Sequence, residues 1–278
     1  MRELNPTATF DWTIPLGRWG NRTVRLHLFF VLAIIASLYL SWLAGQREMT
    51  GNTIWLSAVA VTIVTVSVAM HAAAHIYAAT QLGAPTDPLV IGPHGDFAES
   101  SQQGEPKAQL MTALAGPGVN LLIALACLPG VIPASETSIW PLLNPISPHG
   151  LLAGSAWLIA LKLTLWFNWT LAVVNLLPAR PFDGGPAATS IARLIYARIS
   201  RRRVERFNSR LGVCTGIGLL LAGALVGENT VVALTPAWLP LLLMGVVVLF
   251  ARQRSAHRPQ APLYAEDEWF GYDFSQGY

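Results

Sequence analysis

Residues 64–82, VTVSVAMHAAAHIYAATQL, determine the fold predicted for this chain. The stretch is apolar enough to lie inside a bilayer, and it contains two histidines, His71 and His75, four residues apart. Positions i and i+4 lie on the same face of an α-helix, so both imidazoles can approach one metal ion. An ionisable side chain inside a membrane span marks a functional site by default. Because an HxxxH pair also arises by chance, a metal site requires a further ligand elsewhere in the chain.

The composition is that of an integral membrane protein. Of the 278 residues, 53% are hydrophobic and 12% are charged, whereas a soluble domain contains about 25% charged residues. The net charge of +3 does not indicate nucleic-acid binding, because the basic residues cluster beside the apolar runs. Cys127 and Cys214 each lie in an apolar run, and their number and spacing predict neither a disulfide framework nor a cysteine metal site.

Several apolar runs are long enough to cross the hydrocarbon core, which takes about 20 helical residues. We therefore predict an all-α membrane protein with about six transmembrane helices. The predicted spans are residues 26–44, 54–82, 108–128, 151–177, 211–226 and 231–250. The third span contains Gly116-Pro117-Gly118, which predicts a break in that helix near its start.

The segments outside the spans are polar. Residues 1–25 are predicted to form an N-terminal cytoplasmic arm, and residues 251–278 a disordered tail; residues 26–250 then form the transmembrane domain. Residues 83–107 are rich in proline and glycine around a short apolar piece, which predicts a short β-hairpin after the second span. Residues 187–210 predict an arginine-rich amphipathic helix after the fourth span.

The placement of the basic residues predicts the topology. Nearly all of them lie in the N-terminal arm, in the segment after the fourth span and in the tail, while the third–fourth and fifth–sixth loops have none. Cytoplasmic loops carry the excess of Lys and Arg. We therefore expect both termini of this multi-pass protein on the cytoplasmic side of a bacterial-type cytoplasmic membrane. The late start of the first apolar run predicts that it is not a signal peptide.

Asp183 is the candidate for the third ligand. It follows the fourth span between Pro181 and Gly184, residue types that force a tight turn rather than a continued helix. A carboxylate so close to hydrocarbon is costly unless it is paired or bound to a cation. Two imidazoles and one carboxylate are a zinc-ligand set, and three protein ligands with an open fourth position are typical of catalytic zinc. The sequence therefore predicts one zinc ion bound by His71, His75 and Asp183.

Four motifs follow one another along the chain. They are His71-Ala-Ala-Ala-His75, Gly92-Pro-His-Gly-Asp-Phe-Ala, Ala115-Gly-Pro-Gly-Val-Asn120 and Asn175-Leu-Leu-Pro-Ala-Arg-Pro-Phe-Asp183-Gly-Gly. In this order they resemble the HExxH helix, the hairpin, the next span and the third-ligand motif of the site-2 proteases, which are intramembrane zinc metalloproteases. Trp12-Thr-Ile-Pro-Leu-Gly-Arg also resembles that family's entry segment. The resemblance covers roughly residues 10–250, and the joint pattern is specific although each motif alone is weak.

The resemblance implies a fold, a reaction and partners. A water bound to the zinc held by the two histidines and Asp183 would attack a peptide bond of a transmembrane substrate. Asn120 and Asn175 would orient that substrate, and the hairpin near Gly95 would offer an edge to an unwound substrate strand. The implied partners are the transmembrane segments of client proteins and membrane lipid, with no nucleic acid; the sequence predicts no particular oligomeric state.

The chain departs from the family at the catalytic position itself. The family has a Glu directly after the first histidine, as the general base, whereas this chain has Ala72, which cannot move a proton. General acid–base catalysis contributes about 10²–10⁴-fold to a rate. The family usually also has an Arg after Asp183-Gly-Gly, where this chain has Pro186. We therefore predict a catalytically impaired pseudoprotease that binds transmembrane clients.

Two alternatives remain open. One is an active intramembrane metalloendopeptidase, in which Asp96 or Glu99 of the hairpin loop serves as the base or Ala72 is an introduced substitution. The other is a haem-binding or transport protein, which ranks lower because bundle haem takes one histidine from each of two facing helices. The only histidine in a predicted span besides the HxxxH pair is His27. Three roles remain open for Lys162, in the middle of the fourth span: it pairs with a carboxylate, faces a polar cavity or reaches the membrane interface if the span shifts in register.

Overall fold

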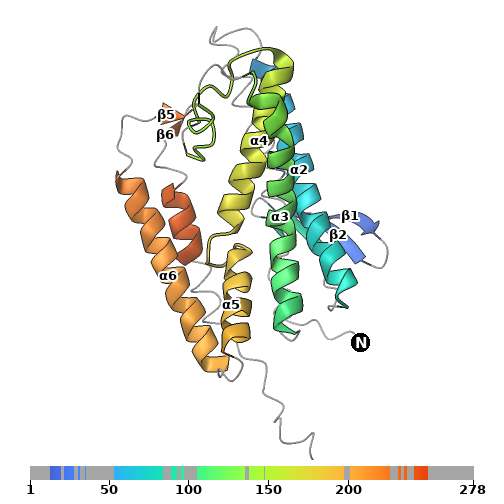
Figure 1. Cartoon of the computed structure of the whole chain (residues 1–278). Coiled ribbons are helices and arrows are strands. Elements are labelled where there is room, and N and C mark those ends of the chain that lie inside the picture. Colours follow the sequence, from blue (N-terminus) through green and yellow to red (C-terminus); the bar gives the residue numbers. More distant parts are fainter. Residues whose placement is uncertain are drawn as a thin grey trace, which may run out of the picture.

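The chain is described by a computed structural model whose long helices run side by side (Figure 1). It describes residues 13–19, 22–27, 31, 35, 53–83, 89–92, 95–96, 105–134, 138–146, 148–196, 201–225, 231–232, 235–236 and 241–249. The helices are α2 Thr53–Gln81, α3 Pro106–Val131, α4 Ala156–Asn175, α5 Gly184–Ile195 and α6 Arg201–Leu225, followed by a helix over 241–249.

Four helices within these described ranges are long and apolar enough to cross a membrane. They cover Trp55–Gln81, Pro106–Val131, Ala156–Asn175 and Arg206–Leu225. The predicted class, an all-α membrane protein, is confirmed, and four of the six predicted spans correspond to these helices.

The start of the first predicted span is wrong, because Leu26 and His27 belong to a β-strand. Beyond them the structure describes only Val31 and Ile35 of residues 26–44, and both are helical. The remainder of that predicted span lies outside the described residues.

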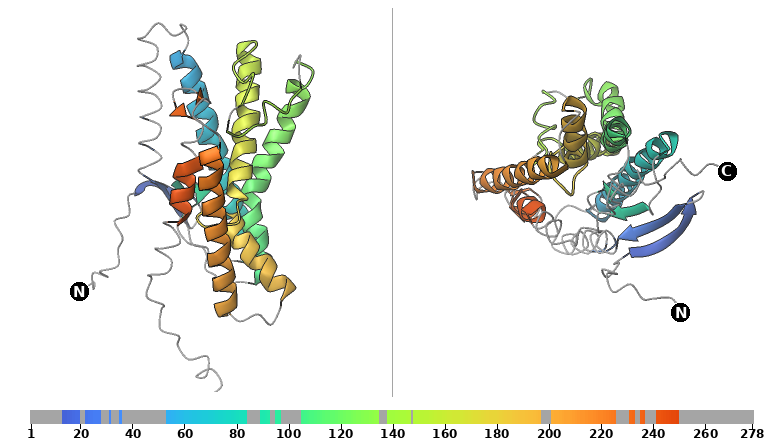
Figure 2. Two further views of the ribbon diagram at one scale, coloured as in Figure 1. Left: turned by 90° about the vertical axis from the view of Figure 1, so that its left-hand side faces the viewer. Right: turned by 90° about the horizontal axis from the view of Figure 1, so that it is seen from below.

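The sixth predicted span, residues 231–250, begins too early. Val231–Val232 and Thr235–Pro236 form the antiparallel strands β5 and β6, and the described helix covers 241–249. The physical reason is the proline content, since Pro236 and Pro240 lack the N–H donors that a helix interior needs. The 241–249 helix packs closely on α6, where a Cβ at Gly245 would meet Leu220 (Figure 2).

The predicted break in the third span does not occur. Helix α3 runs continuously from Pro106 to Val131 and contains Gly116-Pro117-Gly118 in its interior. Pro106 stands in its first turn, where a missing N–H costs nothing. In a membrane helix an interior proline removes one hydrogen bond, and neighbouring helices help to satisfy the freed backbone groups. Because the helix continues through Pro117, residues on both sides of it can share one helix face.

Helix α4 begins at Ala156 and not at the predicted residue 151. Ser155 caps it by accepting a hydrogen bond from the Leu158 N–H, and Gly154 turns the chain with a φ of +114°. The preceding loop is tied to α4 by Lys162, whose Nζ donates to the carbonyl oxygens of Gly150 and Ala153 at 3.0 and 2.9 Å. In the described part of the chain the partners of this lysine are backbone carbonyls of the loop before α4, so the carboxylate pair considered for it is not formed there.

The amphipathic helix predicted after the fourth span is present as α5, but it is shorter than the predicted 187–210. The predicted region divides into α5, which ends at Ile195, and α6, which begins with the arginines at 201–203 and continues into the fifth span. Helix α5 packs against α3 and buries its small residues, while its large apolar residues Ile191, Leu194 and Ile195 are exposed. Small residues allow α5 to approach α3 closely. This approach brings Asp183, the residue before α5, into the bundle.

A four-stranded sheet lies beside α2 (Figure 2). Its order is β1 Thr13–Trp19, β2 Arg22–His27, β3 Leu89–Gly92 and β4 Gly95–Asp96. The β3–β4 pair confirms the hairpin predicted after the second span, and β2 pairs in parallel with β3. The N-terminal arm is predicted as a polar segment over residues 1–25, and the structure shows that it contributes β1 and most of β2. Strand β4 is at the edge of the sheet.

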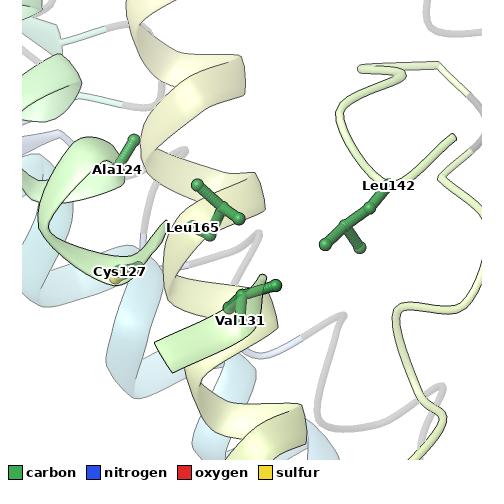
Figure 3. Packing of buried hydrophobic residues seen from close by; sticks show 5 residues of the cluster. All are labelled: Ala124, Cys127, Val131, Leu142 and Leu165. Atoms are coloured by element: carbon green, nitrogen blue, oxygen red, sulfur yellow. The ribbon is translucent and has the colours of Figure 1, made fainter. Parts of the chain in front are cut away.

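The bundle is held by two buried clusters. One joins α3, α4 and the preceding loop through Ala124, Cys127, Val131, Leu142 and Leu165, with Leu142 reaching in from the loop (Figure 3). The second consists of Ala179, Phe182 and Val248 and lies beside the α4–α5 connection. Both cysteines are free, as the sequence predicts.

Candidate metal centre

Two turns of α2 and the α4–α5 connection meet at one point. Nε2 of His71 and Nε2 of His75 lie 3.1 Å apart. Oδ2 of Asp183 lies 3.1 Å from the first and 3.2 Å from the second. Across the described part of the chain, these three residues form the one group of His, Cys, Asp and Glu side chains placed to hold a metal ion.

The three atoms form a nearly equilateral triangle that fits a zinc ion. Tetrahedral ligands at about 2.0–2.1 Å from zinc are separated by about 3.3–3.4 Å, close to the distances in this triangle. A carboxylate oxygen and two unprotonated imidazole nitrogens are all acceptors, so they repel one another unless a proton or a cation lies among them. Buried in a membrane bundle, this repulsion is weakly screened, and the donor set therefore favours a bound cation.

The ring of His75 is oriented by the backbone of α3. Its Nδ1 lies 2.7 Å from the carbonyl oxygen of Thr112, which can only accept, so Nδ1 carries the proton and donates it. The other nitrogen, Nε2, is then the free lone pair that faces the triangle. Hydrogen bonds of this kind fix the tautomer of metal-binding histidines.

The ring of His71 also contacts α3, through Asn120. The amide Nδ2 of Asn120 lies 3.1 Å from Nδ1 of His71, and the Asn120 residue is fully buried. Its Oδ1 is buried without a hydrogen-bond partner among the described residues. Asn120 therefore stands behind the ring, on the side opposite to the triangle.

Gly116 makes room for both rings. A Cβ at this position would collide with Nε2 of His75 and would lie 2.6 Å from Nε2 of His71. Only the absence of a side chain lets α3 approach α2 this closely. The glycine that looked like a helix breaker in the sequence is therefore a packing requirement of the site.

The turn that carries Asp183 is fixed by its neighbours. Phe182 is 1% exposed and packs in the cluster with Val248, and its N–H donates to the carbonyl of Ala179 at 2.9 Å. A Cβ at Gly184 would collide with the carbonyl oxygens of Leu176 and Leu177. The chain can therefore fold back against the end of α4 only with glycine here, and this return points the carboxylate at the imidazoles.

The carboxyl group of Asp183, the residue before α5, favours its ionised form. It occupies the N-cap position of α5, but its side chain makes no capping hydrogen bond and is directed to His71 and His75. Burial alone raises the pKa of Asp183, but its hydrogen bonds with His71 and His75 outweigh burial and hold the pKa below its ordinary value. The positive end of the α5 dipole favours the same charged form.

The position at which the site-2 protease family has its general base, residue 72, is buried. Ala72 is fully buried on α2 beside His71, and its methyl group has no proton-transfer chemistry. Asp96, one of the two substitutes considered, lies in β4, which contacts α2; Glu99 lies outside the described residues. No second carboxylate joins the triangle within the described ranges.

The other predicted residues are distributed as follows. Asn175 is the last residue of α4; its Nδ2 donates to the carbonyl of Leu171 at 3.0 Å, and its buried Oδ1 has no partner in the described part of the chain. His27 ends strand β2, so it is not a helix residue facing the HxxxH pair. This placement removes the histidine on which the haem alternative depended.

Sequence analysis missed one contributor to the site, Thr112, and one link between two helices outside the site, made by Asn168. Thr112 acts through its main-chain carbonyl, which has no sequence signature. Asn168 of α4 donates to Oγ of Ser67 at 2.9 Å, one helical turn from His71, and both residues are buried. A polar residue in the middle of each of two spans was the available signal for this link between α2 and α4.

Comparisons with known proteins show the family of the chain and a solved structure of similar fold. The family model described as peptidase family M50 matches residues 59–222, more than half of the chain. A zinc metalloprotease of Methanocaldococcus jannaschii is 25% identical over 217 residues, which are 77% of this chain and 55% of that protein. The chain thus spans about half the length of that relative. The solved structure of a site-2 protease from the same organism is similar in fold, with a TM-score of 0.58 at 21% identity over 90% of this chain and 98% of that chain.

Proposed function

This chain belongs to peptidase family M50, the site-2 protease family, and from that premise we propose that it binds one zinc ion and transmembrane client segments while having lost efficient peptidase activity. The observation that carries the proposal is the contrast between two neighbouring positions on α2. His71 meets His75 and Asp183 in a complete three-ligand arrangement, while the next residue is the buried Ala72.

The chemistry of the site follows from the residues present. His71, His75 and Asp183 would hold the zinc, and a zinc ion bound there supplies a Lewis acid that lowers the pKa of bound water to about 7. Ala72 offers no group that accepts the proton released when that water attacks a peptide bond. The loss of a general base reduces rates by about 10²–10⁴-fold, so the chain would retain binding and little turnover.

The sheet offers a place for the client. Strand β4 pairs with β3 on one side and is at the end of the strand order, so an extended segment can add to its other edge. Both β3 and β4 contact α2, the helix that carries the histidines. A client strand on β4 would therefore run beside α2, the helix that carries His71 and His75.

The zinc site would lie towards the cytoplasmic face. The arginines that begin α6 lie at one end of the bundle, and the loop before α4 lies at the other (Figure 1). Residues 129–149 of that loop contain no Lys or Arg. The positive-inside rule then assigns the α6 end to the cytoplasm. The same rule, applied to the basic residues of the sequence, assigns both chain termini to that side.

The second candidate function is an active peptidase that uses Asp96 as its base. It is favoured by one observation, the contact of the Asp96-bearing strand β4 with α2. In this case hydrolysis would depend on Asp96, and the chain would cleave without alteration.

The deciding experiment uses the purified full chain in lipid nanodiscs. Zinc content is measured for the unaltered chain and for Asp183→Ala, and cleavage of a single-span test substrate is followed in parallel. We expect about one zinc per unaltered chain, a large loss in Asp183→Ala and no cleavage above background. Equal zinc in both proteins would remove the metal assignment. Cleavage that His71→Ala abolishes would establish the active enzyme, and its loss in Asp96→Asn would identify the base.

A further inference from the structure

Three positions of α3 face the histidine pair. Thr112, Gly116 and Asn120 are spaced four residues apart, so they form one stripe along a continuous helix. The first contacts the ring of His75, the second makes room for both rings, and the third contacts the ring of His71. Each ring of α2 thus meets its own polar group on α3.

The two rings need the same tautomer. For Nε2 to bind a metal ion, it must be unprotonated, and the proton of the neutral ring must then be on Nδ1. His75 meets this condition because Thr112 provides a carbonyl acceptor for its Nδ1–H. His71 requires an acceptor at the same place.

Asn120 has that acceptor. With Nδ2 directed at Nδ1 of His71, the amide donates to the ring, which suits a ring protonated on Nε2 and no bound metal. This orientation leaves Oδ1 of a fully buried residue without a partner in the described part of the chain. The two amide orientations have nearly the same shape, and the hydrogen-bond network decides between them. Rotation of the amide brings Oδ1 to Nδ1 of His71.

We propose that Asn120 is a positioning residue of the metal centre, whose amide oxygen accepts the Nδ1–H of His71 when zinc is bound. This inference rests on the proposed zinc binding. Because Asn120 is buried behind the ring, on the side away from the triangle, it acts on the metal through His71 and does not contact a client. The role differs from the substrate-orienting role that the family resemblance implies.

The test compares three variants of the full chain in nanodiscs. Asn120→Leu removes the acceptor at similar volume, and Asn120→Asp retains an acceptor. Asn168→Leu is the matched control, because Asn168 is equally buried but contacts Ser67 and no imidazole. Zinc dissociation constants are measured by chelator competition, and the visible spectrum of the Co²⁺-substituted protein reports the ligand geometry.

We expect Asn120→Leu to weaken zinc binding by about 10–100-fold, the usual effect of removing such a partner. Asn120→Asp should remain within a few-fold of the unaltered chain, with its Co²⁺ spectrum retained, and Asn168→Leu should bind zinc as the unaltered chain does. Unchanged affinity in Asn120→Leu, or an equal loss in Asn168→Leu, would overturn the inference while leaving zinc binding itself intact. Absence of zinc from the unaltered chain would instead overturn the proposed function and this inference with it.

Discussion

Gly116 of α3 lies directly against the imidazole of His75 of α2, with no space for a Cβ between them. The contact joins the two helices at the level of the metal centre. It also explains why Gly116 stands inside a helix, where glycine is normally unfavourable by about 1 kcal/mol relative to alanine. Glycine is required at position 116 because any side chain there would displace His71 or His75.

Gly116→Ala should therefore abolish zinc binding or weaken it by more than tenfold. The added Cβ would overlap both Nε2 atoms, so the rings must move away from Asp183. Gly118→Ala is the control, since a Cβ there meets nothing within 4 Å and the substitution raises helix propensity equally. Zinc titration of the two purified proteins separates the effects, and equal affinities would contradict the packing argument.

Gly184→Ala should move Asp183, the third ligand, away from the histidines although Asp183 itself is unchanged. A Cβ at Gly184 would collide with two main-chain carbonyls at the end of α4, which cannot rotate away as a flexible side chain can. The return of the chain that directs Asp183 to the histidines would be lost, and zinc content should fall as far as in Asp183→Ala. Gly212→Ala on α6, where a Cβ meets nothing within 4 Å, should leave zinc content unchanged.

The sequence predicts the three residues that meet at the candidate site better than the elements that position them. His71 and His75 follow from helical spacing and Asp183 from its place between Pro and Gly, because these patterns are local. The strands β1 and β2, which pair with each other, were missed; they join the sheet only through the pairing of β2 with β3, more than sixty residues later. Asn120 was recognised as a candidate, but its contact with His71 depends on how α3 packs on α2, which no local pattern specifies.

The continuity of helix α3 was not predicted, for a related reason. Gly116-Pro117-Gly118 resembles a break when it is considered alone, and only the neighbouring rings show why glycine is needed there. The division of 187–210 into two helices also depends on packing, since α5 is held by its small residues against α3. In each case tertiary contact outweighed local propensity.

Lys162→Met should loosen the loop before α4 and leave the metal centre intact. The substitution removes two hydrogen bonds from a charged, buried donor to the carbonyls of Gly150 and Ala153. Hydrogen bonds to charged groups contribute about 1.5–3 kcal/mol each, partly offset here by the cost of burying the charge. We expect faster proteolysis of residues 138–155 at an unchanged zinc content. Lys107→Met, at an exposed lysine near the start of α3, should have no effect on either measurement.

Ala72→Glu tests whether the base alone separates this chain from an active peptidase. The new carboxylate stands next to His71 on α2, the place that the family's general base occupies, and general-base catalysis is worth about 10²–10⁴-fold. Because Ala72 is fully buried, the larger side chain must displace neighbours, and overpacking of this kind costs about 1–3 kcal/mol. We expect a less stable protein that cleaves a single-span test substrate in a zinc-dependent manner. Ala73→Glu places the same carboxylate one residue further around the helix and should remain inactive. If Ala72→Glu binds zinc and is still inactive, a further element of the catalytic machinery is missing, and Pro186, the second departure from the family motif, is the next position to restore, as Pro186→Arg.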